Sequence, residues 1–267
     1  MVAARHGAGS AMLGILDHTM ATAAAHYENL LARHYTWMLG GDLEDTAARD
    51  REMLEGLGVR AGALAVDLGC GPGPQTLALA DLGFATVVGV DSSRELLDEL
   101  DEHARTRPAV RAVNTDLVHA LPAVAEGASA DLVVCMRDTV LHLPHRGAVV
   151  ELFGRVASSL AAGGSFVLTY RDLTRPLEGL ERFMPVRSDP ERIMLCALDY
   201  EDPDTVTVND LIYTRGPGGW ELHKSSYPKL RLAPDWLRDQ LITAGFSIPH
   251  HSPGARGMWS TVAGKPG

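Results

Sequence analysis

The stretch Val66-Asp67-Leu68-Gly69-Cys70-Gly71-Pro72-Gly73 decides the fold class of this 267-residue chain. It continues a short apolar run, and its glycines allow the backbone to turn sharply from a strand into a helix and to approach a ligand closely. Asp91 closes the next apolar run, 18 residues after Gly73. A carboxylate about 20 residues beyond such a loop accepts hydrogen bonds from ribose hydroxyls. The stretch therefore predicts a nucleoside site at a strand–helix turn.

The spacing of the glycines limits which ligands the loop can bind. A dinucleotide site uses G-x-G-x-x-G, so that backbone N–H groups face a pyrophosphate. Here the spacing is G-x-G-x-G, Pro72 removes one N–H donor, and Asp67 adds a carboxylate that repels phosphate but suits an ammonium group. S-adenosylmethionine has a ribose and an ammonium group and no phosphate. Two other readings stay open: a nicotinamide-dependent oxidoreductase on the same fold, and a protein that binds S-adenosylmethionine without methylating anything.

Four motifs together resemble the class I S-adenosylmethionine-dependent methyltransferases of small-molecule type: VDLGCGPG at 66–73, GVDSS at 89–93, NTDL at 114–117 and DLVVCMRDTVLHL at 131–143. The resemblance covers roughly residues 60–170 and 233–263. It implies a Rossmann-like, doubly wound seven-stranded sheet whose last strand is antiparallel. It also implies three sets of cofactor contacts. Contacts to the methionine moiety come from Asp67, Gly69, Gly71 and Gly73. Contacts to the ribose come from Asp91 and Ser92, and contacts to the adenine come from Asp116 and Leu117.

Hydrophobic periodicity agrees with an α/β fold. Apolar runs at 63–68, 86–91, 109–114, 131–136 and 165–170 alternate with helical patterns, as in a parallel sheet covered on both faces. The chain divides into an N-terminal helical lid (1–60), a cofactor-binding core (61–170), an antiparallel β-insert (171–232) and a final segment that completes the core (233–267). Within the insert we expect three strands, at 192–200, 205–213 and 220–232, with a GPGG turn at 216–219. We also expect one lid helix over 20–38 and a helix before residue 165 that ends at Gly163–Gly164.

Residues that follow the fourth and fifth strands are expected at the rim of the site, because ligands bind outside the carboxyl ends of parallel strands. His142 is the candidate general base, and Tyr170 a further catalytic candidate. Met136 and Arg137 are expected near the methionine end of the cofactor, although Arg137 and Asp138 could instead pair with each other. Arg171 resembles an arginine that holds a substrate carboxylate in glycine N-methyltransferase-like enzymes; the alternative is a salt bridge to Asp172 or its neighbours.

The segment 26–38 places large side chains before Gly40–Gly41. Aromatic residues at this spacing are usually core residues. In small-molecule methyltransferases, however, a comparable helix caps the cofactor. That comparison implies that Tyr27, Tyr35 and Met38 close over the sulfonium group.

Composition excludes several function classes. Lys plus Arg total 24 against 34 for Asp plus Glu, a net charge of −10, which disfavours a nucleic-acid surface. No stretch approaches the roughly 20 apolar residues of a membrane span, and the first 16 residues lack a signal-peptide pattern. The three cysteines are far apart and no HExxH or Cys/His cluster occurs, so we expect no metal. We therefore expect a cytoplasmic enzyme, a monomer or homodimer, that methylates O or N of a small molecule, with specialised metabolism as one setting.

Overall fold

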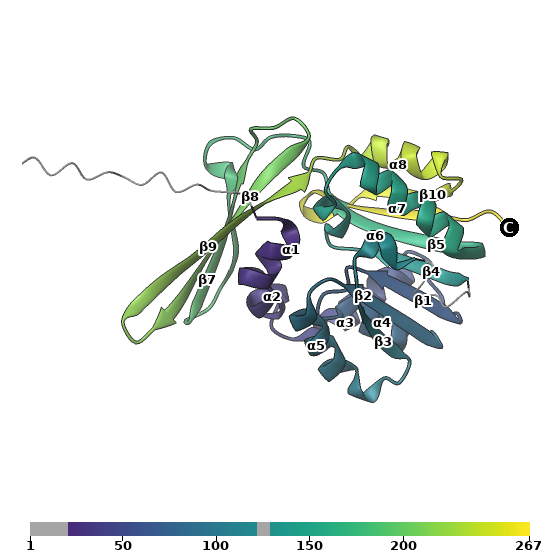
Figure 1. Cartoon of the computed structure of the whole chain (residues 1–267), viewed down its shortest axis with the longest axis horizontal. Coiled ribbons are helices and arrows are strands. Elements are labelled where there is room, and N and C mark those ends of the chain that lie inside the picture. The colour runs from purple at the N-terminus through teal and green to yellow at the C-terminus, as the bar shows by residue number, and fades with distance from the viewer. Residues whose placement is uncertain (1–20, 122–128) are drawn as a thin grey trace, which may run out of the picture.

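The structure is a computed structural model that describes residues 21–121 and 129–267, and the expectation of no signal peptide concerns residues that lie wholly outside these ranges. Its main feature is a seven-stranded sheet in the order β10-β11-β5-β4-β1-β2-β3 (Figure 1). All strands run parallel except β11, which is antiparallel to both of its neighbours, β5 and β10. The doubly wound sheet with an antiparallel last strand is thereby confirmed. The strands are β1 Leu64–Leu68, β2 Thr86–Asp91, β3 Val110–Asn114, β4 Ala130–Cys135, β5 Leu160–Arg171, β10 Ser247–Pro253 and β11 Met258–Gly264.

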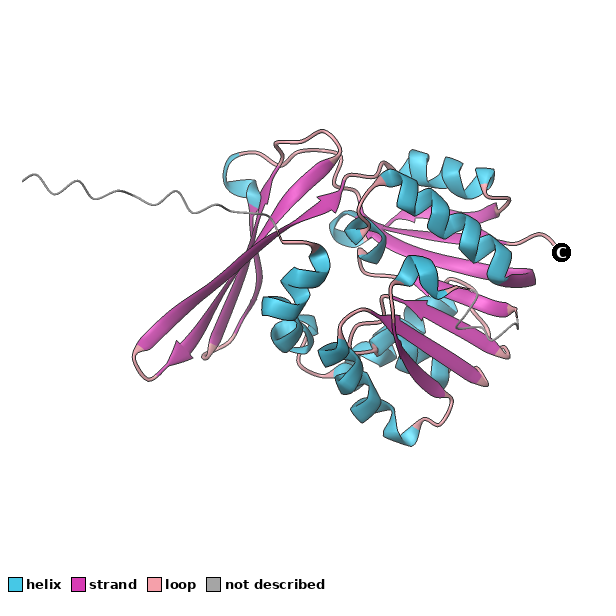
Figure 2. Ribbon diagram, viewed as in Figure 1, coloured by secondary structure: helices cyan, strands magenta, loops and turns pink. Residues whose placement is uncertain are grey.

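Helices cover both faces of this sheet because each strand presents apolar side chains on alternate sides (Figure 2). One face packs against α3 (Leu43–Gly56), α4 (Pro74–Asp81) and α5 (Arg94–His103). The other packs against α6 (Leu117–Ala120), α7 (Arg146–Ser159) and α8 (Pro234–Thr243). Among the described residues, no helix is long and apolar enough to cross a membrane.

The expected helix end at Gly163–Gly164 is wrong. Helix α7 ends at Ser159, and both glycines lie inside the long strand β5. A side chain at residue 164 would place its Cβ 2.9 Å from the carbonyl oxygen of Ala161 and 3.1 Å from that of Ala130. Glycine is therefore required there by the close approach of β5 to β4, where the pairing register shifts, and not by a helix end.

The β-insert has four strands and not three: β6 (Phe183–Ser188), β7 (Arg192–Asp199), β8 (Thr205–Gly216) and β9 (Gly219–Leu230). The GPGG turn joins β8 to β9 as expected. Strand β6, which contains Pro185, lies in residues 171–190, a stretch with Arg and Pro residues for which a loop was expected. Proline is tolerated there because β6 is an edge strand and its register shifts between Pro185 and Arg187.

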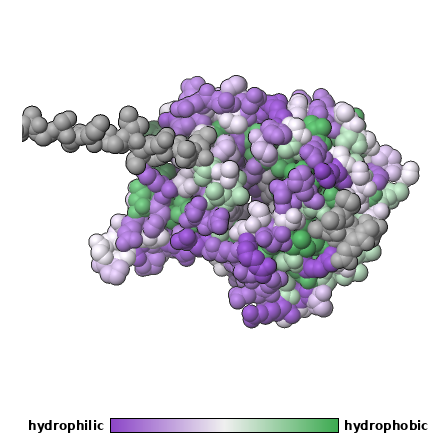
Figure 3. Space-filling view, viewed as in Figure 1, coloured by the Kyte–Doolittle hydropathy of each residue, from purple (hydrophilic) through white to green (hydrophobic). Residues whose placement is uncertain are grey.

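The lid is not one regular helix. It consists of α1 (Ala23–His26), a π-helical turn (Tyr27–Leu31) and α2 (Ala32–Leu39). Leu30, Leu31 and Trp37 pack against Met194 and Ile212 of the insert, so the lid lies between the insert and the seven-stranded core (Figure 1). The space-filling view shows mostly hydrophilic residues over the visible face of the molecule, with small apolar patches between them (Figure 3).

Candidate functional site

The glycine loop joins β1 to α4 through three residues in left-handed conformations, at φ of 73° for Gly69, 56° for Gly71 and 96° for Gly73. The backbone N–H of Gly69 donates to the carbonyl of Val90 at 2.8 Å, which ties the loop to β2. Gly73 precedes the first turn of α4, where Pro74 is well placed because its missing N–H would have no helical partner. The predicted strand–turn–helix is confirmed.

The three glycines face different neighbours. A Cβ at residue 69 would fall within 3.0 Å of the Thr139 side chain, and one at residue 73 within 3.0 Å of Leu100. A Cβ at residue 71 would instead meet the ring of Tyr35 at 3.5 Å, an ordinary contact distance. Packing inside the protein thus demands glycine at 69 and 73, whereas Gly71 faces the lid. Tyr35 lies over the loop, as the lid interpretation requires.

Asp91 holds the glycine loop from the end of β2. Its Oδ2 accepts from the N–H of Gly71 at 2.9 Å, and its Oδ1 accepts from the N–H of Ser93 at 2.8 Å. Burial raises the pKa of this carboxyl, while these N–H donors partly offset the rise. Each oxygen keeps acceptor capacity for a hydroxyl group. Ser92 is exposed beside it.

Asp67 lies beneath the loop with only 1% of its surface exposed. Its Oδ2 accepts from the Thr76 hydroxyl at 2.7 Å. Burial raises the pKa of Asp67 to about 7. A buried carboxylate that lacks a cationic side chain in contact gains stability from an external ammonium group. This observation fits a ligand of the S-adenosylmethionine type.

Asp116 begins α6, where its Oδ1 accepts from the N–H groups of Val118 and His119 at 2.9 and 3.3 Å. Asp116 therefore caps the start of α6 in the structure, and its contact with adenine stays a prediction. Leu117 is half-buried next to it. Met136 is buried in the core beneath β4, and Tyr170 is fully buried in the core on the other face of the sheet.

The turn after β4 contains two consecutive non-glycine residues with positive φ, Arg137 at 55° and Asp138 at 69°. Such strain persists where surrounding contacts fix it, and it occurs often at functional sites. Arg137 Nη2 donates to Asp50 of α3 at 2.6 and 2.8 Å. Asp138, only 2% exposed, accepts from the backbone N–H of Arg171 at 2.8 Å, from Lys229 Nζ at 3.0 Å and from the Arg171 guanidinium.

Two pairings that the sequence left open are thereby decided. Arg137 and Asp138 do not pair with each other, because the strained turn sends their side chains to different elements. Arg171 pairs with Asp138 and not with Asp172. Its side chain nevertheless stays 46% exposed. Thr139, in the same turn, supplies the side chain that excludes a larger residue at Gly69.

His142 lies in a cluster of aromatic rings from three separate parts of the chain. Its ring centroid is 5.7 Å from that of Tyr27 and 5.5 Å from that of Tyr227 on β9. Tyr27 in turn contacts Tyr35 at 5.6 Å. Burial and the charge of Lys229 lower the pKa of His142 to about 3. Sequence reasoning missed Tyr227 and Lys229, since nothing in their spacing connects them with residue 142. Met38 packs against the neighbouring lid–insert cluster.

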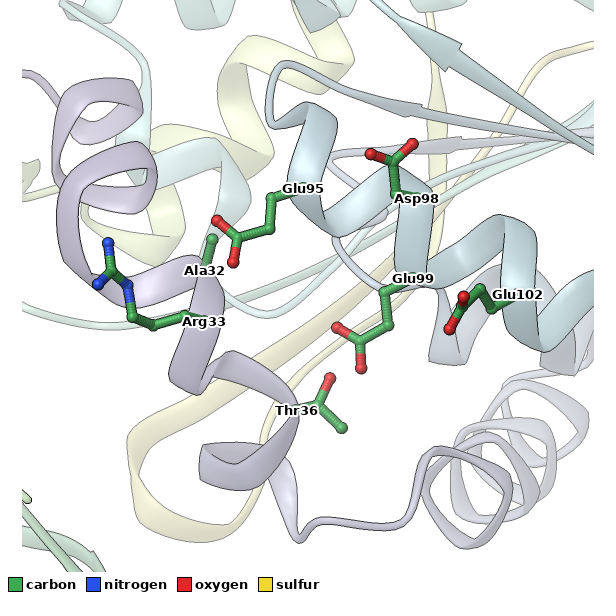
Figure 4. Close-up of a pocket in the computed structure, with 7 residues that line it drawn as sticks. All are labelled: Ala32, Arg33, Thr36, Glu95, Asp98, Glu99 and Glu102. Atoms are coloured by element: carbon green, nitrogen blue, oxygen red, sulfur yellow. The ribbon is translucent and has the colours of Figure 1, made fainter. Parts of the chain in front are cut away.

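A separate hollow of about 390 Å³ lies between α2 and α5 (Figure 4). Four carboxylates of α5 line it, opposite Arg33 and Thr36, and it contains none of the predicted site residues. Within the described part of the chain, no cluster of His, Cys, Asp and Glu could hold a metal ion. The carboxyl ends of the strands beneath the lid remain the candidate site.

Comparison with known proteins agrees with this placement. Residues 65–164 match the family model of a methyltransferase domain. The ubiquinone biosynthesis O-methyltransferase of Methylococcus capsulatus is 38% identical over 97 residues, 36% of this chain and 40% of its own length. The cypemycin N-terminal methyltransferase of a Streptomyces species is 34% identical over 117 residues, 44% of each chain. The chain thus spans less than half the length of these curated relatives.

Solved structures share the fold over most of the chain. An S-adenosylmethionine-dependent methyltransferase of Clostridium acetobutylicum superposes with a TM-score of 0.70 at 18% identity, covering 88% of this chain and 98% of its own. An amino pentose methyltransferase of Micromonospora echinaspora, solved with S-adenosylmethionine bound, also gives 0.70 at 18% identity, covering 87% and 95%. At this identity the likeness concerns the fold alone.

Proposed function

We propose that this chain, a class I S-adenosylmethionine-dependent methyltransferase with its methyltransferase domain at residues 65–164, transfers a methyl group to N or O of a small molecule that carries an anionic group. The observation that carries the proposal is the glycine loop. Gly71 lies between the Asp91 carboxylate and the ring of Tyr35, so a nucleoside held by Asp91 would be covered by the lid. The cypemycin relative supports a setting in specialised metabolism.

The residues of this loop fit S-adenosylmethionine, which when bound supplies an electrophilic methyl group on sulfur. Asp91 would accept from the ribose hydroxyls, and the buried Asp67 would stabilise the ammonium group from beneath the loop. Tyr27 and Tyr35 would cover the sulfonium, whose charge suits an aromatic face. Asp116 and Leu117, at the start of α6, would contact the adenine.

The acceptor would lie between the lid, the strained turn and the insert. His142 contacts lid and insert rings at once and can position the acceptor group. Asp138 orients Arg171 through its backbone N–H and its guanidinium, and the exposed remainder of the guanidinium is suited to grip a carboxylate or phosphate. Methyl transfer depends above all on holding the nucleophile in line with the methyl carbon, so this grip serves turnover as well as affinity.

Cofactor binding is tested by calorimetry with S-adenosylhomocysteine. We expect one site per chain in the wild type and a loss of about 1.5–3 kcal/mol, roughly tenfold to 150-fold in affinity, for Asp91→Ala. Asp98→Ala on the exposed surface of α5 is the matched control and should bind normally. Binding of NADH in place of S-adenosylhomocysteine would revive the oxidoreductase alternative.

Methyl transfer is tested with S-adenosylmethionine labelled in the methyl group and a panel of small amines and alcohols, with and without a carboxylate or phosphate. We expect Arg171→Lys and Arg171→Ala both to lower kcat/KM for anionic acceptors, since lysine keeps the charge and loses the planar fork. Arg175→Ala, in the exposed loop that follows, is the control. Near-equal kcat/KM values for all four proteins would remove Arg171 from the site.

A further inference from the structure

The four-stranded sheet of the insert has two apolar faces, and within the described residues the lid covers only one of them. Residues directly opposite each other on antiparallel strands lie on the same face, so the register of β7, β8 and β9 assigns each residue to a face. Met194 and Ile212 lie on the face that packs against the lid. The other face, here called the outer face, points away from the lid and the core (Figure 2). Its apolar rows contain Ile193, Leu195, Leu211, Tyr213, Trp220 and Leu222.

The sequence of β7 is typical of a strand that is buried on both faces. Residues 193–198 read Ile-Met-Leu-Cys-Ala-Leu, an uninterrupted apolar run. An antiparallel strand with one face in water usually alternates apolar and polar residues instead. Residues 211–213 of β8, Leu-Ile-Tyr, repeat the apolar run. The insert therefore has apolar side chains for contact on both faces, and the lid accounts for the contact on one.

The edges of this sheet are protected against further strand pairing, whereas the outer face is apolar and exposed. The edge strand β6 contains Pro185 and the edge strand β9 contains Pro228, and proline has no N–H group to donate to an added strand. Lys224 places an exposed charge on β9, which also disfavours an added strand. A partner is therefore expected against the face of the sheet and not along its edge.

The outer face is large enough for a specific interface. The eight residues of β7 span about 26 Å and the four strands about 19 Å, so the face measures about 500 Å² in projection. Two such faces bury about 1,000 Å² or more, which is the area that a specific interface needs. Tyr213 and Trp220 lie in adjacent rows, and the guanidinium carbon of Arg215 lies 5.9 Å from the centre of the Trp220 ring. Trp, Tyr and Arg are the residues most enriched where binding energy concentrates.

The distribution of charge favours a second copy of this chain as the partner. Within the strands, the outer face carries Arg215 and Lys224 in the half nearer the turn between β8 and β9, here called the tip. Asp199 lies on the same face at the opposite end, here called the base, where Glu201 and Asp202 follow in the exposed loop before β8. A two-fold axis that lies between two sheets and crosses their strands places each tip over the other base. Opposite charges then meet twice.

We propose that this protein forms a two-fold symmetric dimer through the outer faces of its inserts, with the tip of one insert over the base of the other. The same patch is used on both copies, as two-fold symmetry requires. Trp220 and Leu222, each 45% exposed in the single chain, become buried in the dimer. The proposal does not depend on the proposed function, because the outer face lies on the opposite side of the insert from the lid and the candidate site.

The mass in solution, measured by sedimentation velocity across a wide range of protein concentration, tests the dimer. We expect the wild type to have twice the mass of one chain. Leu222→Glu and Trp220→Ala should each raise the dissociation constant of the dimer at least about 30-fold. Ile242→Glu is the matched control, since Ile242 is 52% exposed on α8 and the change adds the same charge away from the insert.

Urea unfolding of each variant separates a lost interface from a lost fold. All three substitutions are at exposed positions, so the unfolding midpoints of the monomeric variants should not depend on protein concentration, whereas that of the wild type should rise with it. A wild type that stays monomeric at every concentration would overturn the proposal. So would a dimer that Ile242→Glu weakens as much as Leu222→Glu does.

Reversal of charge tests how the two inserts are oriented. Lys224→Glu and Glu201→Lys should each weaken the dimer by about fivefold, since each reversal affects two contacts. The two changes combined in one chain should restore the dimer, because opposite charges meet again. Failure of this restoration would overturn the tip-over-base arrangement. A monomeric wild type that dimerises once residues 1–20 are removed would show that the chain's own first residues occupy the face, which would also overturn the proposal.

Discussion

Replacing Gly71 by alanine separates ligand binding from folding at the glycine loop. The added Cβ would lie 3.5 Å from the Tyr35 ring and 3.9 Å from Leu96, so it meets only ordinary contacts. The backbone at φ 56° is the left-handed region, which costs an L-residue about 1–2 kcal/mol. The hydrogen bond from residue 71 N–H to Asp91 survives in alanine. We therefore expect Gly71→Ala to fold, with a free energy of unfolding lowered by only about 1–2 kcal/mol.

Ligand binding should suffer more than this stability change indicates. The new methyl group lies against the ring of Tyr35, which the proposed function places over the sulfonium of the cofactor, so it disturbs the lid where the lid would close on the ligand. Overpacking a filled site by one methyl group costs about 1–3 kcal/mol, which lowers affinity for S-adenosylhomocysteine about fivefold to 150-fold. Calorimetry measures the affinity, and urea unfolding measures the stability.

Gly69→Ala and Gly73→Ala are the contrasting variants. Each adds a Cβ within 3.0 Å of a side chain, Thr139 or the fully buried Leu100, on top of the left-handed backbone cost. We expect losses of about 2–5 kcal/mol in unfolding free energy for each. Thr139→Ser removes the nearest methyl group and should restore part of the stability of Gly69→Ala. Equal stability losses in all three alanine variants, or normal affinity in Gly71→Ala, would refute the assignment of Gly71 to the ligand side.

Three further outcomes follow from contacts elsewhere. Burial raises the pKa of Asp138, but the charges of Lys229 and Arg171 outweigh burial and hold that pKa below its usual value. The ionised Asp138 therefore stabilises the fold above about pH 4, and this stabilisation is lost as pH falls. Asp138→Asn should lower the free energy of unfolding by about 3 kcal/mol at neutral pH and make that free energy fall less steeply in acid. Trp37→Phe loses the hydrogen bond from Nε1 to Asp189 on the insert and should cost about 1 kcal/mol in thermal unfolding. Binding of S-adenosylhomocysteine should slow amide hydrogen exchange over residues 22–39. Unchanged exchange there would show that this segment is part of the protein core and not a lid that the cofactor orders.

The core of the fold was predictable because its signals are local. The apolar run at 86–91 has the same bounds as strand β2, and the glycine loop lies where the motif predicts it. Strand β6 was missed because proline usually indicates a loop, and the sequence does not show that the strand containing Pro185 lies at the edge of its sheet, where proline is tolerated. The π-helical turn at Tyr27–Leu31 was missed because its residues form an ordinary helical pattern, and only packing against the insert selects the wider turn.

The residues expected to bind the cofactor lie in short motifs whose members are neighbours in sequence, so the sequence could group them, and their contacts with the cofactor stay a prediction. The partners of the residues expected to bind the acceptor could not be found in this way. Lys229 reaches Asp138 across 91 residues, and His26 reaches Asp210 across 184. No periodicity or spacing connects such pairs, so the sequence could name His142 and Arg171 as candidates and could not supply the residues that contact them.

Contacts from several elements converge on the strained turn at Arg137 and Asp138. Arg137 ties the turn to α3, Asp138 ties it to β5 and β9, and Thr139 touches the space above Gly69. We therefore expect a one-residue change in this turn to shift the glycine loop, the insert and His142 together, because the two left-handed residues leave the backbone little freedom to absorb it. A mutation in the turn should consequently change cofactor affinity and acceptor turnover in parallel.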